Sequence, residues 1–272
     1  MTRRDIGSSS NPTAGRPPRF IVVIAAAAAI FVVLPLFGLL WRAPWSDLWS
    51  LLGRDVVWDA LRLSLITSVS ATAASILMGV PLAWVLARTS FPGRSLLRAL
   101  VLLPMILPPV VGGAALLFAL GRRGLVGEWL YDTFGILLPF STAGAIVAAT
   151  FVAMPFLVIS VEAALRSVDR RYEEAAVTLG ASRWTVFRRV TLPMIAPSMA
   201  AGAALCWARA LGEFGATITF AGNLQGRTQT MPLAVFLALE NDRGAAIALS
   251  LVLVAISLAV LVALRDRWFA TP

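Results

Sequence analysis

The chain has 272 residues, 59% hydrophobic and only 14% charged, whereas about a quarter of a typical soluble protein is charged. Its net charge is +9, all 23 basic residues are arginine, and it contains no histidine and a single cysteine, Cys206. These absences exclude a P-loop ATPase, lysine Schiff-base and histidine general-base enzymes, and zinc sites built from histidine or several cysteines. We therefore predict a membrane protein that is not an enzyme, holds no metal or cofactor itself, and takes its energy from a partner or a gradient.

The N-terminal residues 1–19 are rich in serine, proline and arginine and have no apolar period, which predicts a disordered cytoplasmic tail. Residues 20–41 are uncharged and long enough to cross a bilayer, which needs roughly 20 apolar residues. A cleaved secretory signal is the weaker interpretation. The apolar run is longer than a signal core, and Trp41, Arg42 and Pro44 follow where small residues should be.

Five more apolar segments of spanning length follow, at residues 63–87, 99–121, 143–165, 194–222 and 244–264. Before the third of these, Pro139 and Gly144 interrupt the apolar run, so we assign residues 134–140 to a short outer segment. The predicted fold is all-α and polytopic, with residues 20–272 forming one domain of six transmembrane helices.

The arginines set the predicted orientation. Most of them lie in the tail, in the loops after the second and fourth spans, and at the C-terminal end. Because arginine favours the cytoplasmic side, both termini are predicted to be cytoplasmic. The opposite side collects tryptophans, as an interfacial belt does: Trp41, Trp45, Trp49, Trp58 and Trp129. The positive charge thus follows from membrane topology, and we expect no nucleic-acid partner.

The cytoplasmic loop at residues 166–193 has the pattern of two short helices. One apolar stripe runs at i, i+3, i+4 and i+7 through Tyr172, Ala175, Ala176 and Leu179. Gly180 follows where a left-handed helix C-cap belongs, and Ser182 can cap the second helix. That helix carries Trp184, Phe187 and Val190 on its apolar side, and we expect it to stop at Pro193. From the pattern alone, the loop is either a docking surface for a partner or an amphipathic hairpin on the lipid headgroups.

The same loop carries a longer signature: Glu174-Ala175-Ala176, three residues, Gly180, nine residues, and then Val190-x-Leu192-Pro193. It resembles the EAA loop of permease subunits of bacterial ATP-binding-cassette importers, with valine at position 190 where isoleucine is common. The resemblance implies a coupling element that docks into a cleft on a separate ATPase, which would hold ATP and Mg²⁺. The implied coupling residues are Tyr172, Glu174, Ala175, Ala176, Gly180, Trp184, Leu192 and Pro193.

Arg209 and Glu213 are charged residues inside the fifth predicted span, four positions apart and so on one helix face. Charges within a span usually face a bundle interior or a water-filled cavity. The pair is therefore either part of a pathway or a structural lock between helices. Glu162, near the cytoplasmic end of the fourth span, has Arg166 one turn later as its expected partner.

Two segments extend the resemblance, which covers about residues 61–264. The stretch 208–233 is similar to the fifth helix and following outer loop of molybdate permeases, and its Arg209-Ala-Leu-Gly-Glu-Phe-Gly215 core is shared with sulfate permeases. Residues 103–113 are similar to the proline-rich third helix of that group. The implied pathway or gate residues are Pro108, Pro109, Arg209, Glu213, Thr217 and Thr219.

Taken with the resemblance, the sequence predicts the permease of a type I ATP-binding-cassette importer in the bacterial inner membrane. It would carry a tetrahedral oxyanion, molybdate or tungstate, with sulfate or thiosulfate as the alternative substrate and a gradient-driven secondary transporter as the alternative class. The expected partners are cytoplasmic ATPase subunits, a periplasmic or lipid-anchored binding protein, and a second copy of the chain in a homodimer.

Overall fold

The computed structural model describes the backbone of residues 18–268 and the side chains of residues 18–262. The predicted disordered tail, residues 1–19, lies outside the described residues except for its last two positions. The chain divides into two units, one ending at Ala43 and the other beginning at Pro44. The described part of the first unit is essentially α1 (Arg19–Trp41), the helix predicted as the first span.

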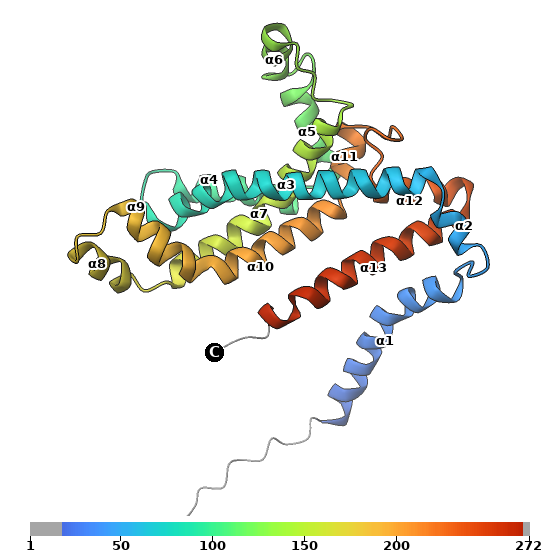
Figure 1. Cartoon of the computed structure of the whole chain (residues 1–272), viewed down its shortest axis with the longest axis horizontal. Coiled ribbons are helices and arrows are strands. Elements are labelled where there is room, and N and C mark those ends of the chain that lie inside the picture. Colours follow the sequence, from blue (N-terminus) through green and yellow to red (C-terminus); the bar gives the residue numbers. More distant parts are fainter. Residues whose placement is uncertain (1–17, 269–272) are drawn as a thin grey trace, which may run out of the picture. The chain divides into compact units, whose positions relative to one another are not determined.

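The second unit is built on three long helices, α3 (Asp55–Arg88), α7 (Thr142–Ser167) and α10 (Leu192–Leu211) (Figure 1). α7 packs along both α3 and α10. Small residues allow this close packing, because helix backbones in membranes approach through glycine, alanine and serine. The buried cluster between the three helices includes Ala71, Ala83, Ala149, Ala153, Leu157, Val161, Ile195 and Cys206.

One more long helix and several short helices extend this core. α13 (Arg243–Trp268) packs against α12 and α10. The remaining elements are α2 (Leu48–Leu52), α4 (Arg94–Ile106), α5 (Pro109–Leu120), α6 (Gly127–Phe134), α8 (Arg171–Thr178), α9 (Arg183–Val186), the π-helix η1 (Phe187–Thr191), α11 (Gly215–Phe220) and α12 (Met231–Asn241).

Among the described residues, five helical stretches are long and apolar enough to cross a membrane: α1, α3, α7, the continuous stretch Arg183–Leu211, and α13. The third predicted span, residues 99–121, is divided between two helices and is not one continuous helix. Leu107 is extended, with ψ of 135°, because the ring of the following proline disfavours the helical conformation. Pro109 then begins α5, which runs in a different direction from α4 (Figure 1).

The fifth predicted span, residues 194–222, is also interrupted. α10 ends at Leu211, a short turn follows, and α11 begins at Gly215. α12 was not predicted, because it lies in the segment that was assigned to an outer loop. Its signal was Pro232, which occupies the first turn, where a missing N–H costs no helical hydrogen bond.

Pro193 does not stop the second helix of the loop at residues 166–193, contrary to the prediction. The chain runs without a break from α9 through η1 into α10. In η1 the hydrogen bonding shifts to i→i+5, and the Leu192 N–H donates to the Phe187 carbonyl. Proline has no N–H to donate at position 193, and the wider turn just before it lets the helix continue past that position.

Asp242 ties the start of α13 to the region before α3. Its Oδ1 accepts the Ala245 N–H at 3.0 Å, and its Oδ2 pairs with Arg54 at 2.8 Å. The backbone hydrogen bond, together with the Arg54 guanidinium, lowers the pKa of this carboxyl below its ordinary value. Both contacts therefore favour the ionised form of Asp242 in the folded protein.

Candidate functional site

The turn after α8 has the conformation that the sequence predicted. Gly180 has φ of +84°, and the Ala181 N–H donates to the Ala176 carbonyl at 3.0 Å, closing a Schellman-type C-cap. Ser182 then accepts the Thr185 N–H at 3.2 Å and caps α9, as predicted. Two fixed caps therefore set the angle between α8 and the following helix.

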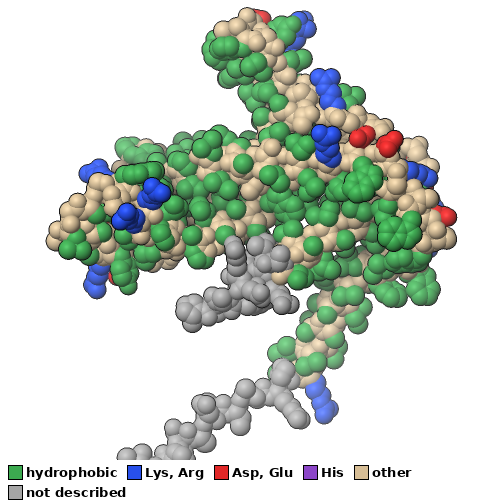
Figure 2. All heavy atoms as spheres, in the orientation of Figure 1, with side chains coloured by type: hydrophobic (Ala, Val, Ile, Leu, Met, Phe, Trp, Pro, Cys, Tyr) green, Lys and Arg blue, Asp and Glu red, His purple; other side chains and the backbone are tan. Residues whose placement is uncertain are grey.

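The predicted apolar stripe of α8 faces away from the rest of the unit. Tyr172 is 60% exposed, Leu179 88% and Trp184 68%. Ala175 is also exposed, and Ala176 is half-buried. Basic side chains gather at this end of the unit (Figure 2). Exposed apolar side chains beside basic residues are typical of a protein-docking surface.

The remaining predicted coupling residues fall into two groups. Glu174 is exposed, and its backbone carbonyl accepts the Thr178 hydroxyl at 2.9 Å. Leu192 and Pro193 lie in the first turn of α10. Both residues therefore lie outside α8 and belong to the continuous helix that starts at α9.

Arg209 and Glu213 form an ion pair, with Nη1 and Oε2 2.6 Å apart. The Glu213 side chain is 2% exposed and the Arg209 side chain 28%. The pair does not share one helix face as predicted, because α10 ends at Leu211 and Glu213 lies in the turn before α11. Its Oε1 accepts the Ala216 N–H at 2.8 Å, so the carboxylate also caps α11.

The proline-containing break between α4 and α5 lies beside this turn. A Cβ added to Gly215 would stand 2.7 Å from the Pro109 Cβ, so the start of α11 touches the start of α5. Pro108 and Pro109 are both exposed. Of the two predicted pathway threonines, Thr217 is buried, and Thr219 donates its hydroxyl to the Gly215 carbonyl at 2.8 Å.

Close packing of α5 against α11 depends on Gly113. A Cβ there would lie 2.7 Å from the Thr219 Cβ and 2.8 Å from the Ala216 carbonyl oxygen. We expect Gly113→Ala to lower the free energy of unfolding by about 1–3 kcal/mol, because the backbones must separate. Thermal unfolding in detergent measures the effect.

The control is Gly112→Ala, where the nearest atom is the side-chain Cε1 of Phe151 at 3.2 Å and the ring can shift. Equal destabilisation by both variants would contradict a special role for position 113.

Glu162 is buried near the C-terminal end of α7 and is paired twice. Arg166 binds its Oε1 at 2.8 Å, which confirms the predicted partner, and Arg98 of α4 binds the same oxygen. The Arg98 contact was not predicted, because it joins residues that are far apart in the sequence. A carboxylate held by two guanidiniums has a structural explanation without a role as a proton site.

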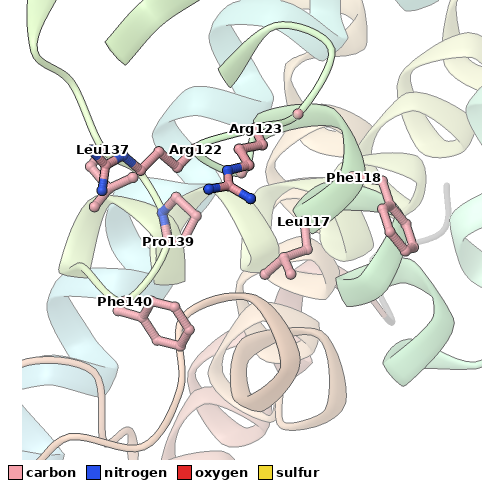
Figure 3. Close-up of a pocket in the computed structure, with 9 residues that line it drawn as sticks. Leu117, Phe118, Arg122, Arg123, Leu137, Pro139 and Phe140 are labelled. Carbon is pink, nitrogen blue, oxygen red and sulfur yellow. The ribbon is translucent and has the colours of Figure 1, made fainter. Parts of the chain in front are cut away.

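A cavity of about 480 Å³ lies between α5 and the segment that follows α6 (Figure 3). Its lining is mostly apolar, with two arginines: Leu117, Phe118, Arg122, Arg123, Leu137, Pro139 and Phe140. It contains none of the predicted pathway residues. Arg122 is held by the Tyr131 ring, 4.5 Å from its guanidinium carbon.

Comparison with known proteins adds independent evidence. Residues 79–270 match the family described as "Binding-protein-dependent transport system inner membrane component". The molybdenum transport system permease protein ModB of Mycobacterium tuberculosis is 46% identical over 250 residues, 92% of this chain and 94% of that protein. ModB of Escherichia coli is 45% identical over 216 residues, 79% of this chain and 94% of that protein.

More distant matches include the sulfate transport system permease protein CysT of Escherichia coli. It is 39% identical over 236 residues, 85% of each chain. A solved bacterial ABC transporter that imports the acidic polysaccharide alginate has a TM-score of 0.73 at 20% identity, covering 93% of this chain and 96% of that chain. This structural likeness shows a shared fold.

Proposed function

This chain belongs to the inner membrane component family of binding-protein-dependent transport systems, and we propose that it is the subunit that carries molybdate through the membrane in an ATP-binding-cassette importer. It is a multi-pass permease of the inner membrane, and the ATPase is a separate subunit. The observation that carries the substrate assignment is the 46% identity to a molybdenum permease over 92% of the chain. The identity to a sulfate permease is 39% over 85%.

The proposed substrate class is a tetrahedral oxyanion. Molybdate and tungstate are dianions of similar shape, and sulfate is the second candidate because a sulfate permease is also a relative. The permease should bind its substrate weakly, since conduction requires that it leave again. Selection among these anions is therefore assigned mainly to the external binding protein.

The proposed topology has six crossings and both termini in the cytoplasm. α4 and α5, of 13 and 12 residues, together supply the third crossing around the proline break. The arginine distribution supports this orientation. The proposed assembly is a homodimer of this chain with two ATPase subunits and a binding protein, because one copy offers few helices to surround a hydrated anion.

The proposed mechanism converts ATP-driven closure of the partner subunits into rigid-body motion of the helices. The exposed stripe of α8, together with Glu174 and Trp184, is the proposed docking surface. Its support is the exposure of these side chains on a fixed pair of capped helices. Arg209 and Glu213, beside the break at Pro108 and Pro109, are the proposed gate. Such a switch needs two discrete packings of stiff elements rather than new chemistry at the docking surface.

Reconstitution tests this function. The chain, its partner ATPase and its binding protein are placed in proteoliposomes, and uptake of molybdate, tungstate and sulfate is measured at equal concentration. We expect that molybdate uptake requires hydrolysable ATP. We also expect tungstate to inhibit molybdate uptake more strongly than sulfate does. Preference for sulfate would move the substrate assignment to the second candidate. Uptake driven by a proton gradient without ATP would contradict the importer mechanism.

A further inference from the structure

Glu173, next to the signature glutamate, joins three elements at the cytoplasmic end of the unit. Arg88, the last residue of α3, donates from Nη2 to the Glu173 Oε1 at 3.0 Å. Thr191, the last residue of η1, donates its hydroxyl to the same oxygen at 2.7 Å. The side chains of Arg88 and Glu173 are only 10% and 19% exposed, and Thr191 is buried. Glu173 thus has the opposite environment to its exposed neighbour Glu174.

Aromatic side chains lie beside this cluster. The Arg88 guanidinium carbon lies 5.9 Å from the centre of the Trp84 ring. Trp84 meets Phe187 edge-on, with ring centres 5.2 Å apart, and Phe187 in turn packs against Trp184 at 5.5 Å. Hydrogen bonds to charged groups are stronger where water is excluded. The cluster is therefore a built joint and not a loose surface ion pair.

α8 depends on this joint for its orientation. Within residues 18–262, Glu173 is the α8 side chain that hydrogen-bonds to another helix, and it reaches two of them. Apart from these bonds, α8 packs mainly on α9 and η1. Since Tyr172 and Ala175 point outward, little apolar burial holds the helix in place.

The joint also connects α8 to the helix that carries the proposed gate. Thr191 lies in η1, which continues without a break into α10, and Arg209 lies near the far end of α10. Arg88 ends α3, the helix that packs against α7 and α10 in the core. A displacement of α8 is therefore applied at once to the ends of two core helices.

We propose that Glu173 is a positioning residue that locks α8 to α3 and α10, so that movement of a docked ATPase reaches the pathway. The inference rests on the proposed function, because it gives Glu173 a part in coupling ATP hydrolysis to import. Glu174 is then the residue of the pair that faces the partner, and Glu173 the one that faces the permease.

The test measures molybdate imported per ATP hydrolysed in proteoliposomes that hold the complete complex. Glu173→Gln keeps the shape of the side chain but removes its charge. We expect the ATPase to stay bound and active, while the import-to-ATP ratio falls about tenfold, the factor that corresponds to about 1.4 kcal/mol. Arg88→Gln should give the same fall, and the double variant Arg88→Gln/Glu173→Gln no more than either alone.

Two further variants test the positioning role. Glu128→Gln, which removes an exposed carboxylate from α6, should leave the ratio unchanged. The exchanged pair Arg88→Glu/Glu173→Arg should recover part of the ratio, and it also serves if a single variant fails to assemble. An unchanged ratio in Glu173→Gln, additive losses in the double variant, or no recovery in the exchanged pair would overturn the positioning role. Failure of the proposed function is separate, since it appears as absent ATP-driven import in the unaltered complex.

Discussion

Replacement of Gly180 by valine is expected to abolish most molybdate import while the partner ATPase continues to hydrolyse ATP. Gly180 has φ of +84°, a conformation that costs an L-residue roughly 1–2 kcal/mol and a β-branched residue more. An added Cβ meets no atom within 4 Å, so the strain is not a steric clash in the core. The strain instead turns α8 relative to α9 and misplaces the docking surface. We expect at least a tenfold fall in import per ATP, equivalent to about 1.4 kcal/mol.

Gly93 offers a matched control for this variant. It has φ of +85°, and a Cβ there also meets nothing within 4 Å, but it precedes α4, outside the loop at residues 166–193. Gly93→Val should lower the unfolding temperature about as much as Gly180→Val does, but it should leave the import-to-ATP ratio unchanged. Gly180→Asn should retain more import than Gly180→Val, because asparagine tolerates left-handed backbone. Equal loss of coupling at positions 93 and 180 would contradict the docking role.

Replacement of Arg209 by leucine is expected to destabilise the protein and to stop import. It leaves the Glu213 carboxylate, 2% exposed, without its cation. Removing one partner of a buried ion pair costs about 3–5 kcal/mol, and the lower end applies because Arg209 is 28% exposed. Thermal unfolding in detergent measures the first effect and ATP-driven uptake the second.

The double variant Arg209→Leu/Glu213→Gln separates a gate from a structural lock. Glutamine at position 213 can still accept the Ala216 N–H, and no buried charge remains unpaired. We expect unfolding stability to return to within about 1 kcal/mol of the unaltered protein while import stays low. Recovery of import together with stability would show that the pair only locks the helices, and would remove it from the pathway.

Local features of the chain were predictable because they depend on neighbouring residues. The left-handed turn at Gly180 and the cap at Ser182 are confirmed, since both follow from backbone conformations that these residue types favour. The long apolar helices are confirmed for the same reason, because hydropathy over about 20 residues decides them. The pairing of Glu162 with Arg166 is a further local contact that the sequence placed correctly.

The interruptions of the helices were predicted less well. Hydropathy does not change at a break inside an apolar run. It therefore predicted one span for α4 and α5 and one span for α10 and α11. The prolines at 108 and 109 were visible signals for the first break, and the carboxylate of Glu213 caps a new helix at the second. Pro193 misled in the opposite direction, because a π-helical turn let the helix continue.

The sequence alone therefore determined where the long apolar helices lie, where the loop at residues 166–193 turns, and which family signature that loop carries. Only the tertiary structure decided that Glu173 faces inward while Glu174 faces outward. Adjacent glutamates have the same helix propensity and hydropathy, and the difference arises from Arg88 and Thr191, which lie 85 and 18 residues away. The approach of α5 to α11 at Gly113 is of the same kind, because a contact between distant segments leaves no local mark in either one.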